Sequence, residues 1–180
     1  EAMTPILTMT PDAGAKLTTS WSPEVEDLPS LTVHRACGLN AGPHLLITGG
    51  VHGDEYEGPA AATQFSQSLD PEKLAGTVTV IPVVNVAAWQ ARTRCTPIDQ
   101  GNLNRVFPGN PEGNPTEKLA AAVFENFVQP TDAVIDLHSG GAAIIHLPMV
   151  GVPGTDARAA SIVASFDHRF YNWRMPDVTG

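Results

Sequence analysis

The sequence predicts an α/β fold in which a mostly parallel or mixed central sheet is covered by helices on both faces. Short β-branched runs alternate along the chain with longer segments of helical character, an order typical of sheets with parallel strands. The apolar run 44–48 leads into two glycines, as a strand buried on both faces does before a tight turn. With 180 residues, 42% of them hydrophobic and 16% charged, the chain is long enough to bury one core.

The elements are expected in a regular order. The N-terminal segment 1–43 contains two Thr- and Val-rich runs, and a Pro-rich acidic stretch between them predicts two strands joined by a loop, at 16–21 and 31–35. The remaining segment, 44–180, is expected to form the main α/β domain. It begins with the buried strand and then alternates helix, strand, helix and strand, predicted at 58–69, 77–84, 116–128 and 133–137.

Two further segments carry expectations of their own. Residues 92–115 have little periodicity and many Gly, Asn and Pro residues, which predicts a long loop, and such loops in compact domains are often functional. After residue 150 we expect one helix, 156–166, with no closing strand behind it. The domain is therefore expected to lack its C-terminal part.

Composition argues against several classes of partner. The net charge of -9 and the lack of any run rich in Lys or Arg argue against nucleic-acid binding. No apolar stretch approaches the roughly 20 residues of a membrane span, and the first residues do not resemble a signal peptide. Two widely spaced cysteines, Cys37 and Cys95, predict neither a disulfide framework nor a thiolate zinc site. We expect a cytoplasmic protein, and the composition leaves its oligomeric state open.

The first motif with chemical character follows the buried strand. His52 and Glu55 lie three positions apart in a turn that opens a helix, so an imidazole and a carboxylate can face one point. Catalytic zinc sites commonly combine three such ligands with a water molecule. Alone, this spacing is weak evidence, because acids at a helix start more often complement the helix dipole. The neighbouring Asp54 and Glu57 are expected to cap the helix or face solvent.

His138, at the end of the predicted strand 133–137, is the natural third ligand. Asp136 would lie on the same face of that strand and can orient an imidazole as a hydrogen-bond acceptor. A core histidine is the alternative interpretation. Because sites in such sheets form at the carboxyl ends of strands, we predict one zinc ion at His52, Glu55 and His138, although non-haem iron also suits these ligands.

The long loop contains an Asn-Arg pair. The planar guanidinium of Arg105 fits a carboxylate through two hydrogen bonds, and the adjacent Asn104 can supply another donor. A substrate carboxylate could bind there. An isolated Asn-Arg pair more often has no such role. In that interpretation Arg105 forms an ion pair with a surface acid, which contributes about 0 to 1 kcal/mol to stability.

Taken together, these segments resemble the succinylglutamate desuccinylase and aspartoacylase family, a branch of the zinc carboxypeptidase-like metallohydrolases. The resemblance spans about residues 45–141 and rests on three motifs in order, at 49–58, 102–109 and 136–140. Three ordered motifs are far more specific than any one of them. The resemblance implies a zinc carboxypeptidase-like fold and the zinc ligands His52, Glu55 and His138.

The resemblance also implies roles for residues that do not bind the metal. Asn104 and Arg105 would hold the carboxylate of the substrate. An arginine before that pair would polarise the scissile carbonyl, for which Arg94 is our choice and Arg92 the alternative. The implied activity is a zinc-dependent hydrolase that cleaves the amide of an N-acyl amino acid or a similar small carboxylate.

The general base that the resemblance implies is a glutamate on a later strand. After His138 the acidic residues are three aspartates and no glutamate is present. We therefore predict that this 180-residue chain binds zinc but has little or no hydrolase activity alone. Two alternatives remain open: a metallocarboxypeptidase, which needs the same metal and carboxylate clamp, and a non-catalytic zinc-binding or ligand-sensing domain.

Overall fold

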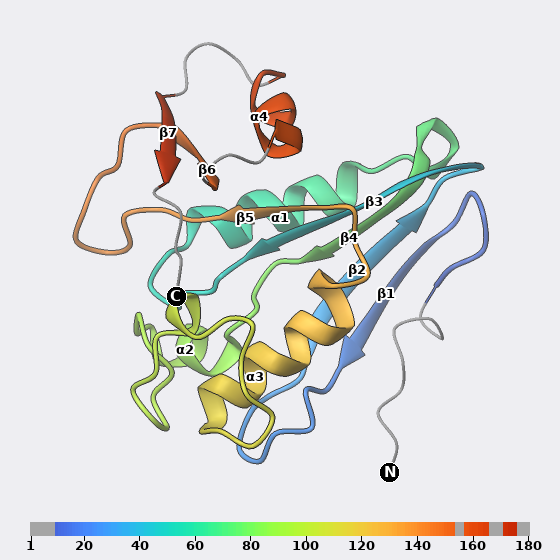
Figure 1. Cartoon of the computed structure of the whole chain (residues 1–180). Coiled ribbons are helices and arrows are strands. Elements are labelled where there is room, and N and C mark those ends of the chain that lie inside the picture. The colour runs from blue at the N-terminus through green and yellow to red at the C-terminus, as the bar shows by residue number, and fades with distance from the viewer. Residues whose placement is uncertain (1–9, 154–156, 166–170, 176–180) are drawn as a thin grey trace. The chain divides into compact units, whose positions relative to one another are not determined.

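The computed structural model describes residues 10–153, 157–165 and 171–175. Contacts divide the chain into two compact units, 1–142 and 143–180. The division into segments 1–43 and 44–180 stays a prediction. The first unit contains a five-stranded sheet in the order β1-β2-β4-β3-β5 (Figure 1). Its strands are β1 (Lys16–Trp21), β2 (Leu31–Cys37), β3 (Asn40–Gly49), β4 (Ala75–Ile81) and β5 (Ala133–Leu137).

The sheet is mixed. β1 and β2 form the predicted N-terminal pair of strands and are antiparallel, and β2 is also antiparallel to β4. β3 runs parallel to β4 on one side and to β5 on the other. Because β3 and β5 are parallel and Gly49 pairs with Leu137, their carboxyl ends lie together at one edge of the sheet. The predicted fold class is confirmed.

Helices cover both faces of this sheet (Figure 1). α1 (Glu57–Ser68) lies on one face, and α3 (Pro115–Val123), continued by the π-helical turn η4 (Phe124–Val128), lies on the other. α3 begins where the sequence supplies both helix-start signals. The Asn114 side chain accepts from the Glu117 amide, the Glu117 side chain accepts from the Asn114 amide, and Pro115 occupies the first turn.

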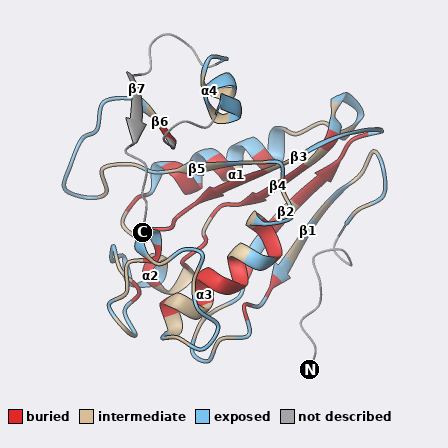
Figure 2. Cartoon of the chain, in the orientation of Figure 1, coloured by how far each residue is buried: buried red, intermediate tan, exposed pale blue. Residues whose placement is uncertain are grey.

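Alternating strand residues build a core on each face (Figure 2). On the α3 side Leu46 packs with Trp21 and Phe127, whose rings meet edge to face at 4.8 Å. On the α1 side the next residue of β3, Ile47, packs with Ala62 and other apolar residues. This period of two, with apolar residues at both phases, explains why residues 45–47 are apolar without interruption.

Several short elements were not predicted from the sequence. β4 ends at Ile81, and α2 (Val86–Ala91) follows it, started by the Asn85 side chain, which accepts from the Ala88 amide at 3.1 Å. The predicted strand 77–84 is therefore too long at its end. Two 3-10 turns are also present, η2 (Pro71–Lys73) after α1 and η3 (Leu103–Arg105) within the predicted loop.

The second unit contains β6 (Met149–Pro153), α4 (Ala157–Val163) and β7 (Tyr171–Met175), and its two strands are parallel. α4 falls within the predicted helix 156–166, whose two end residues lie outside the described ranges. β7 shows that the expectation of no further strand was wrong. No helix among the described residues is long and apolar enough to cross a membrane.

Candidate metal centre

The turn after β3 is packed against α2. The backbone of Gly53 approaches α2 so closely that a Cβ atom there would overlap the backbone of Ala88 and Trp89. The Gly53 amide donates to the Thr93 carbonyl at 2.9 Å, just after the C-terminal end of the same helix. Only glycine permits this approach. The turn therefore holds His52 and Glu55 in fixed positions, at 1% and 2% exposure.

The parallel pairing of β3 and β5 brings His138 to this turn. Glu55 lies between the two histidines: Oε1 is 2.8 Å from His52 Nδ1, and Oε2 is 2.9 Å from His138 Nδ1. One ligand atom from each of the three residues lies within 4.8 Å of the others. The structure thus brings together the three side chains that the sequence analysis selected as metal ligands.

Each histidine presents its other ring nitrogen to an oxygen atom. His138 Nε2 lies 2.7 Å from Asp136 Oδ2, and Asp136 Oδ1 accepts from the Thr48 hydroxyl at 2.8 Å. This is the orienting contact expected of Asp136. His52 Nε2 lies 3.1 Å from Asn102 Oδ1. The sequence analysis did not assign Asn102 a role, although it lies in the same motif as Asn104, because no local pattern predicts a side-chain contact across 50 residues.

The Glu55 carboxylate is surrounded by nitrogen donors. Besides the histidines, Arg94 Nη1 donates to Oε1 at 3.0 Å and the Ser139 amide donates to Oε2 at 3.0 Å. Burial alone would raise the pKa of Glu55, but hydrogen bonds from His138, His52 and the Ser139 amide outweigh it and hold the pKa well below its usual range. Glu55 is therefore a carboxylate at neutral pH.

The pKa of His138 is shifted in the opposite direction, upward. Burial disfavours its charged form, yet the hydrogen bonds to Asp136 and Glu55 outweigh this and raise the pKa of His138 to about 10. Two carboxylates therefore stabilise positive charge at one imidazole. A cation at this point, whether a proton or a metal ion, satisfies the same electrostatic demand.

The arginines and the asparagine selected from the loop differ in exposure and in contact with this cluster. Arg94 contacts Glu55 through one nitrogen while 49% of its side chain remains exposed. Arg92, the alternative, is the left-handed residue that ends α2. Asn104 and Arg105 are exposed on η3, and Arg105 Nη1 donates to the Asn104 carbonyl at 3.0 Å. Within the described ranges, no carboxylate forms an ion pair with Arg105.

The two acids beside the ligands were both expected to cap the helix or face solvent, which Glu57 does and Asp54 does not. Glu57 is exposed and accepts from the Ser139 hydroxyl at 2.6 Å, so it contacts the residue after His138. Asp54 has a buried Oδ1 with no hydrogen-bond partner among the described residues. The expectation for Asp54 was wrong, because the loop at Gly141 covers it: a Cβ at Gly141 would lie 2.7 Å from Asp54 Oδ2.

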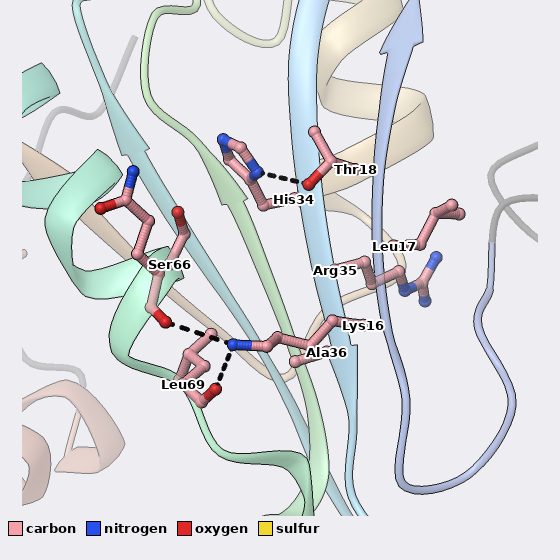
Figure 3. Close-up of a pocket in the computed structure, with 9 residues that line it drawn as sticks. Lys16, Leu17, Thr18, His34, Arg35, Ala36, Ser66 and Leu69 are labelled. Carbon is pink, nitrogen blue, oxygen red and sulfur yellow. Dashed lines mark hydrogen bonds between the residues drawn. The ribbon is translucent and has the colours of Figure 1, made fainter.

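A separate pocket of about 290 Å³ lies where β1 and β2 meet the end of α1 (Figure 3). Several of its polar side chains are already paired. Lys16 Nζ donates to the carbonyls of Gln67, at 3.2 Å, and Leu69, and Thr18 Oγ1 lies 2.9 Å from His34 Nδ1 (Figure 3). Because α1 has no basic residue in its last turn, Lys16 serves as its C-terminal cation. This pocket is explained by the fold.

Comparison with known proteins places the chain in a family. Residues 41–170 match the model of the succinylglutamate desuccinylase/aspartoacylase catalytic domain, a span that includes all three clustered side chains. The chain belongs to this family. The resemblance inferred from the three ordered motifs is therefore confirmed, and the match extends beyond their limits at both ends.

Individual relatives share the fold at moderate identity. N-alpha-acetyl-L-2,4-diaminobutyric acid deacetylase from Halomonas elongata is 47% identical over 107 residues, 59% of this chain and 31% of the relative. Succinylglutamate desuccinylase/aspartoacylase from Rhodobacter sphaeroides superposes with a TM-score of 0.75 at 30% identity, covering 86% of this chain and 49% of that protein.

A third relative was solved with product bound. It is the ectoine utilization protein EutE (DoeB) from Ruegeria pomeroyi, with a TM-score of 0.71 at 33% identity over 85% of this chain and 49% of that protein. The chain therefore spans about half the length of these solved family members. Their structures support the carboxypeptidase-like α/β fold of the first unit, with its mixed sheet and a helix on each face.

Proposed function

We propose that this chain carries the metal centre and the carboxylate clamp of a zinc-dependent hydrolase that cleaves the amide of an N-acyl amino acid. The convergence of His52, Glu55 and His138 is the observation that carries this proposal. On both rings Nδ1 faces a carboxylate oxygen of Glu55, a position that either a proton or a metal ion on Nδ1 satisfies. With its proton on Nε2, a neutral imidazole offers the Nδ1 lone pair to a metal ion.

The donor set fits zinc. Two imidazole nitrogens and one carboxylate are a common protein contribution to catalytic zinc sites, and the outer contacts to Asn102 and Asp136 are of the kind that orients ligating histidines. Bound zinc would supply Lewis acidity, which activates water and polarises a carbonyl. One zinc ion per chain is proposed, because only one such cluster occurs among the described residues.

The remaining roles belong to residues of the chain itself. Arg94 reaches the cluster through Glu55 and keeps half of its side chain exposed, so its guanidinium can stabilise negative charge that develops on a scissile carbonyl oxygen. Asn104 and Arg105 are exposed on η3, where their donors can bind a substrate carboxylate. Asp136 and Asn102 hold the rings.

The substrate class is supported by the family and by one relative. The Halomonas elongata relative is named for removing an N-acetyl group from an amino acid, which favours deacylation over carboxypeptidase activity. Because the chain matches 31% of that relative, this activity is proposed for the protein to which the metal centre belongs. The 180 residues themselves are expected to show little turnover, since no glutamate follows His138. A cytoplasmic location also stays a prediction.

Metal content is the first test. The purified chain, loaded with zinc and desalted, should retain about one zinc ion per chain by elemental analysis. His52→Ala and His138→Ala should each lose it. His34→Ala is the matched control, because His34 lies in the pocket of Figure 3, and it should retain full zinc. A correctly folded chain that binds no zinc would remove the basis of the proposal.

Ligand binding tests the substrate class. An N-acetyl amino acid should bind the zinc-loaded chain, and Arg105→Ala should weaken binding roughly tenfold through loss of a charge-assisted bidentate contact. Lys73→Ala, which removes an exposed lysine paired with Asp70, is the matched control. If a dipeptide bound better than the N-acetyl amino acid, the carboxypeptidase alternative would be preferred.

A further inference from the structure

Asn102 uses one oxygen atom for two contacts. Its Oδ1 lies 3.1 Å from His52 Nε2, and it also accepts from the Asn104 backbone amide at 3.1 Å. A backbone N–H can only donate, so the atom that faces it is the amide oxygen and not the amide nitrogen. The same oxygen can accept a proton from His52 Nε2. When a metal ion takes His52 Nδ1 in place of the contact with Glu55, the remaining ring proton lies on Nε2, and Asn102 matches that tautomer.

The second contact ties the same oxygen to the turn that bears the carboxylate clamp. Asn102 is the residue that starts η3, and Asn104 and Arg105 are the last two residues of that turn. Leu103, the first residue of η3, is fully buried in the core, so the turn is anchored at its start. One side chain therefore joins a buried metal ligand to the exposed clamp.

We propose that Asn102 is a positioning residue for both parts of the site: it orients the His52 ring by accepting the Nε2 proton when Nδ1 binds the metal, and it holds the η3 turn beside it. The proposal rests on the metal centre proposed above. The role of Asp136 at the other histidine is different. Asp136 is a carboxylate, and it also accepts from the Thr48 hydroxyl. Asn102 supplies a neutral acceptor to His52 and depends on its Asn104 contact for its own orientation.

Asn102→Ser separates the two contacts. A serine oxygen at this position can still accept from the Asn104 amide and start the 3-10 turn, but the side chain is one bond shorter and cannot reach His52. We expect zinc affinity, measured by competition with a chromophoric chelator, to fall about tenfold, as for the loss of an orienting contact. Amide exchange at Asn104 in the zinc-free chain should change little.

Asn102→Asp is the rescue variant. It keeps an acceptor oxygen at the same length, so zinc affinity and Asn104 protection should both stay at or above the wild-type level. Asn110→Ala is the matched control, because Asn110 Oδ1 makes the same kind of turn contact in the same loop, to the Glu112 amide at 3.0 Å, without touching a ligand. Its zinc affinity should stay within twofold of wild type, a margin of about 0.4 kcal/mol.

The outcomes separate this proposal from the one beneath it. Wild-type zinc affinity in Asn102→Ser would overturn the positioning role while leaving the metal centre in place. A tenfold loss in Asn102→Asp as well would overturn it too, because that variant retains the acceptor. If the wild-type chain bound no zinc, the metal centre would fail and the positioning role with it. The absorption spectrum of the cobalt-substituted chain gives a second readout, which should shift in Asn102→Ser and return in Asn102→Asp.

Discussion

The two halves of the proposed metal centre are held in different ways. The turn that carries His52 and Glu55 is buried, with the two residues at 1% and 2% exposure, and its backbone packs on α2. The strand end that carries His138 belongs to β5, at the edge of the sheet, and the side chains of His138 and Asp136 are each 32% exposed. Packing fixes the first half, whereas polar contacts fix the second.

This difference has a consequence for how the site forms. Packed side chains keep their positions without a ligand, because any movement opens a cavity or creates an overlap. A partly exposed histidine held by carboxylates keeps its position through its charge, supplied by a proton or a bound metal ion. The turn is therefore a preformed half-site, and the strand end completes it when a cation is present. Such preorganisation lowers the entropy lost on metal binding.

The largest expected effect is on stability, when a glycine in each half is replaced by alanine. Gly53→Ala drives a Cβ into the backbone of Ala88 and Trp89, which neither residue can relieve by a change of side-chain rotamer. We expect a loss of at least about 3 kcal/mol in the free energy of unfolding. Gly141→Ala, in the loop after His138, meets only the end of the Asp54 side chain, at a φ of 66°. It should cost about 1 to 2 kcal/mol.

Urea unfolding of the two glycine variants checks this order. Both should be measured in the presence of a chelator, so that metal binding does not contribute. If Gly141→Ala proved as destabilising as Gly53→Ala, the strand end would be as rigidly packed as the turn, and the contrast between the halves would fail.

The next effect concerns the two histidines in the zinc-free chain. His52→Ala removes a fully buried ring and leaves a cavity beside Glu55, and we expect a loss of about 2 to 4 kcal/mol in the free energy of unfolding. His138→Ala removes a partly exposed ring, so the loss through packing should stay near 1 kcal/mol. Any further loss comes from its charge pairs with Glu55 and Asp136, and it should shrink as salt is added. Both variants should lose zinc binding but differ in stability. Equal losses of stability at high salt would contradict the packing argument.

Much of this arrangement could be predicted from the sequence, for identifiable reasons. A strand buried on both faces is continuously apolar, and parallel neighbours carry their carboxyl ends to one edge, which places His52 and His138 together without any knowledge of the coordinates. Asp136 followed because the period of two puts it on the same strand face as His138. These inferences use local periodicity and sheet geometry.

What could not be predicted depends on contacts between distant side chains. The 50-residue separation between Asn102 and His52 leaves no periodic signal, and an asparagine before a turn ordinarily serves only the turn. The predicted strand 77–84 ran past Ile81 because β-branched residues continue to Val84, and the short helix α2 that begins after Asn85 was not predicted. The buried Oδ1 of Asp54 could not be predicted either, because the Gly141 loop that lies against this side chain is more than eighty residues away in sequence.

The smallest expected effect is a pH dependence of the loop that carries Asn102, which contacts His52 on the turn side of the metal centre. The loop that carries Asn102 is held to α3 by Asp99, whose Oδ1 accepts from the Thr116 hydroxyl at 2.6 Å and whose Oδ2 accepts from the Thr116 amide at 2.8 Å. Burial would raise the pKa of Asp99, but these hydrogen bonds and one from the Gly101 amide lower it below its usual value. The contact therefore stabilises the folded chain above the unfolded pKa of about 3.9, and this stability is lost as pH falls through the lower folded value.

Amide exchange at two positions tests whether acid loosens only the turn side. Between pH 5 and roughly pH 3, protection of the Thr116 amide should fall several-fold, because protonation of Asp99 removes the acceptor that holds it. Protection of the Ser139 amide should persist over the same range, since the pKa of its acceptor, Glu55, is held well below the usual carboxyl value. Asp99→Asn should abolish the change at Thr116 and leave Ser139 unaffected. If protection fell equally at the Thr116 and Ser139 amides, the loop and the strand end would open together in acid, and the contrast between the two halves would fail.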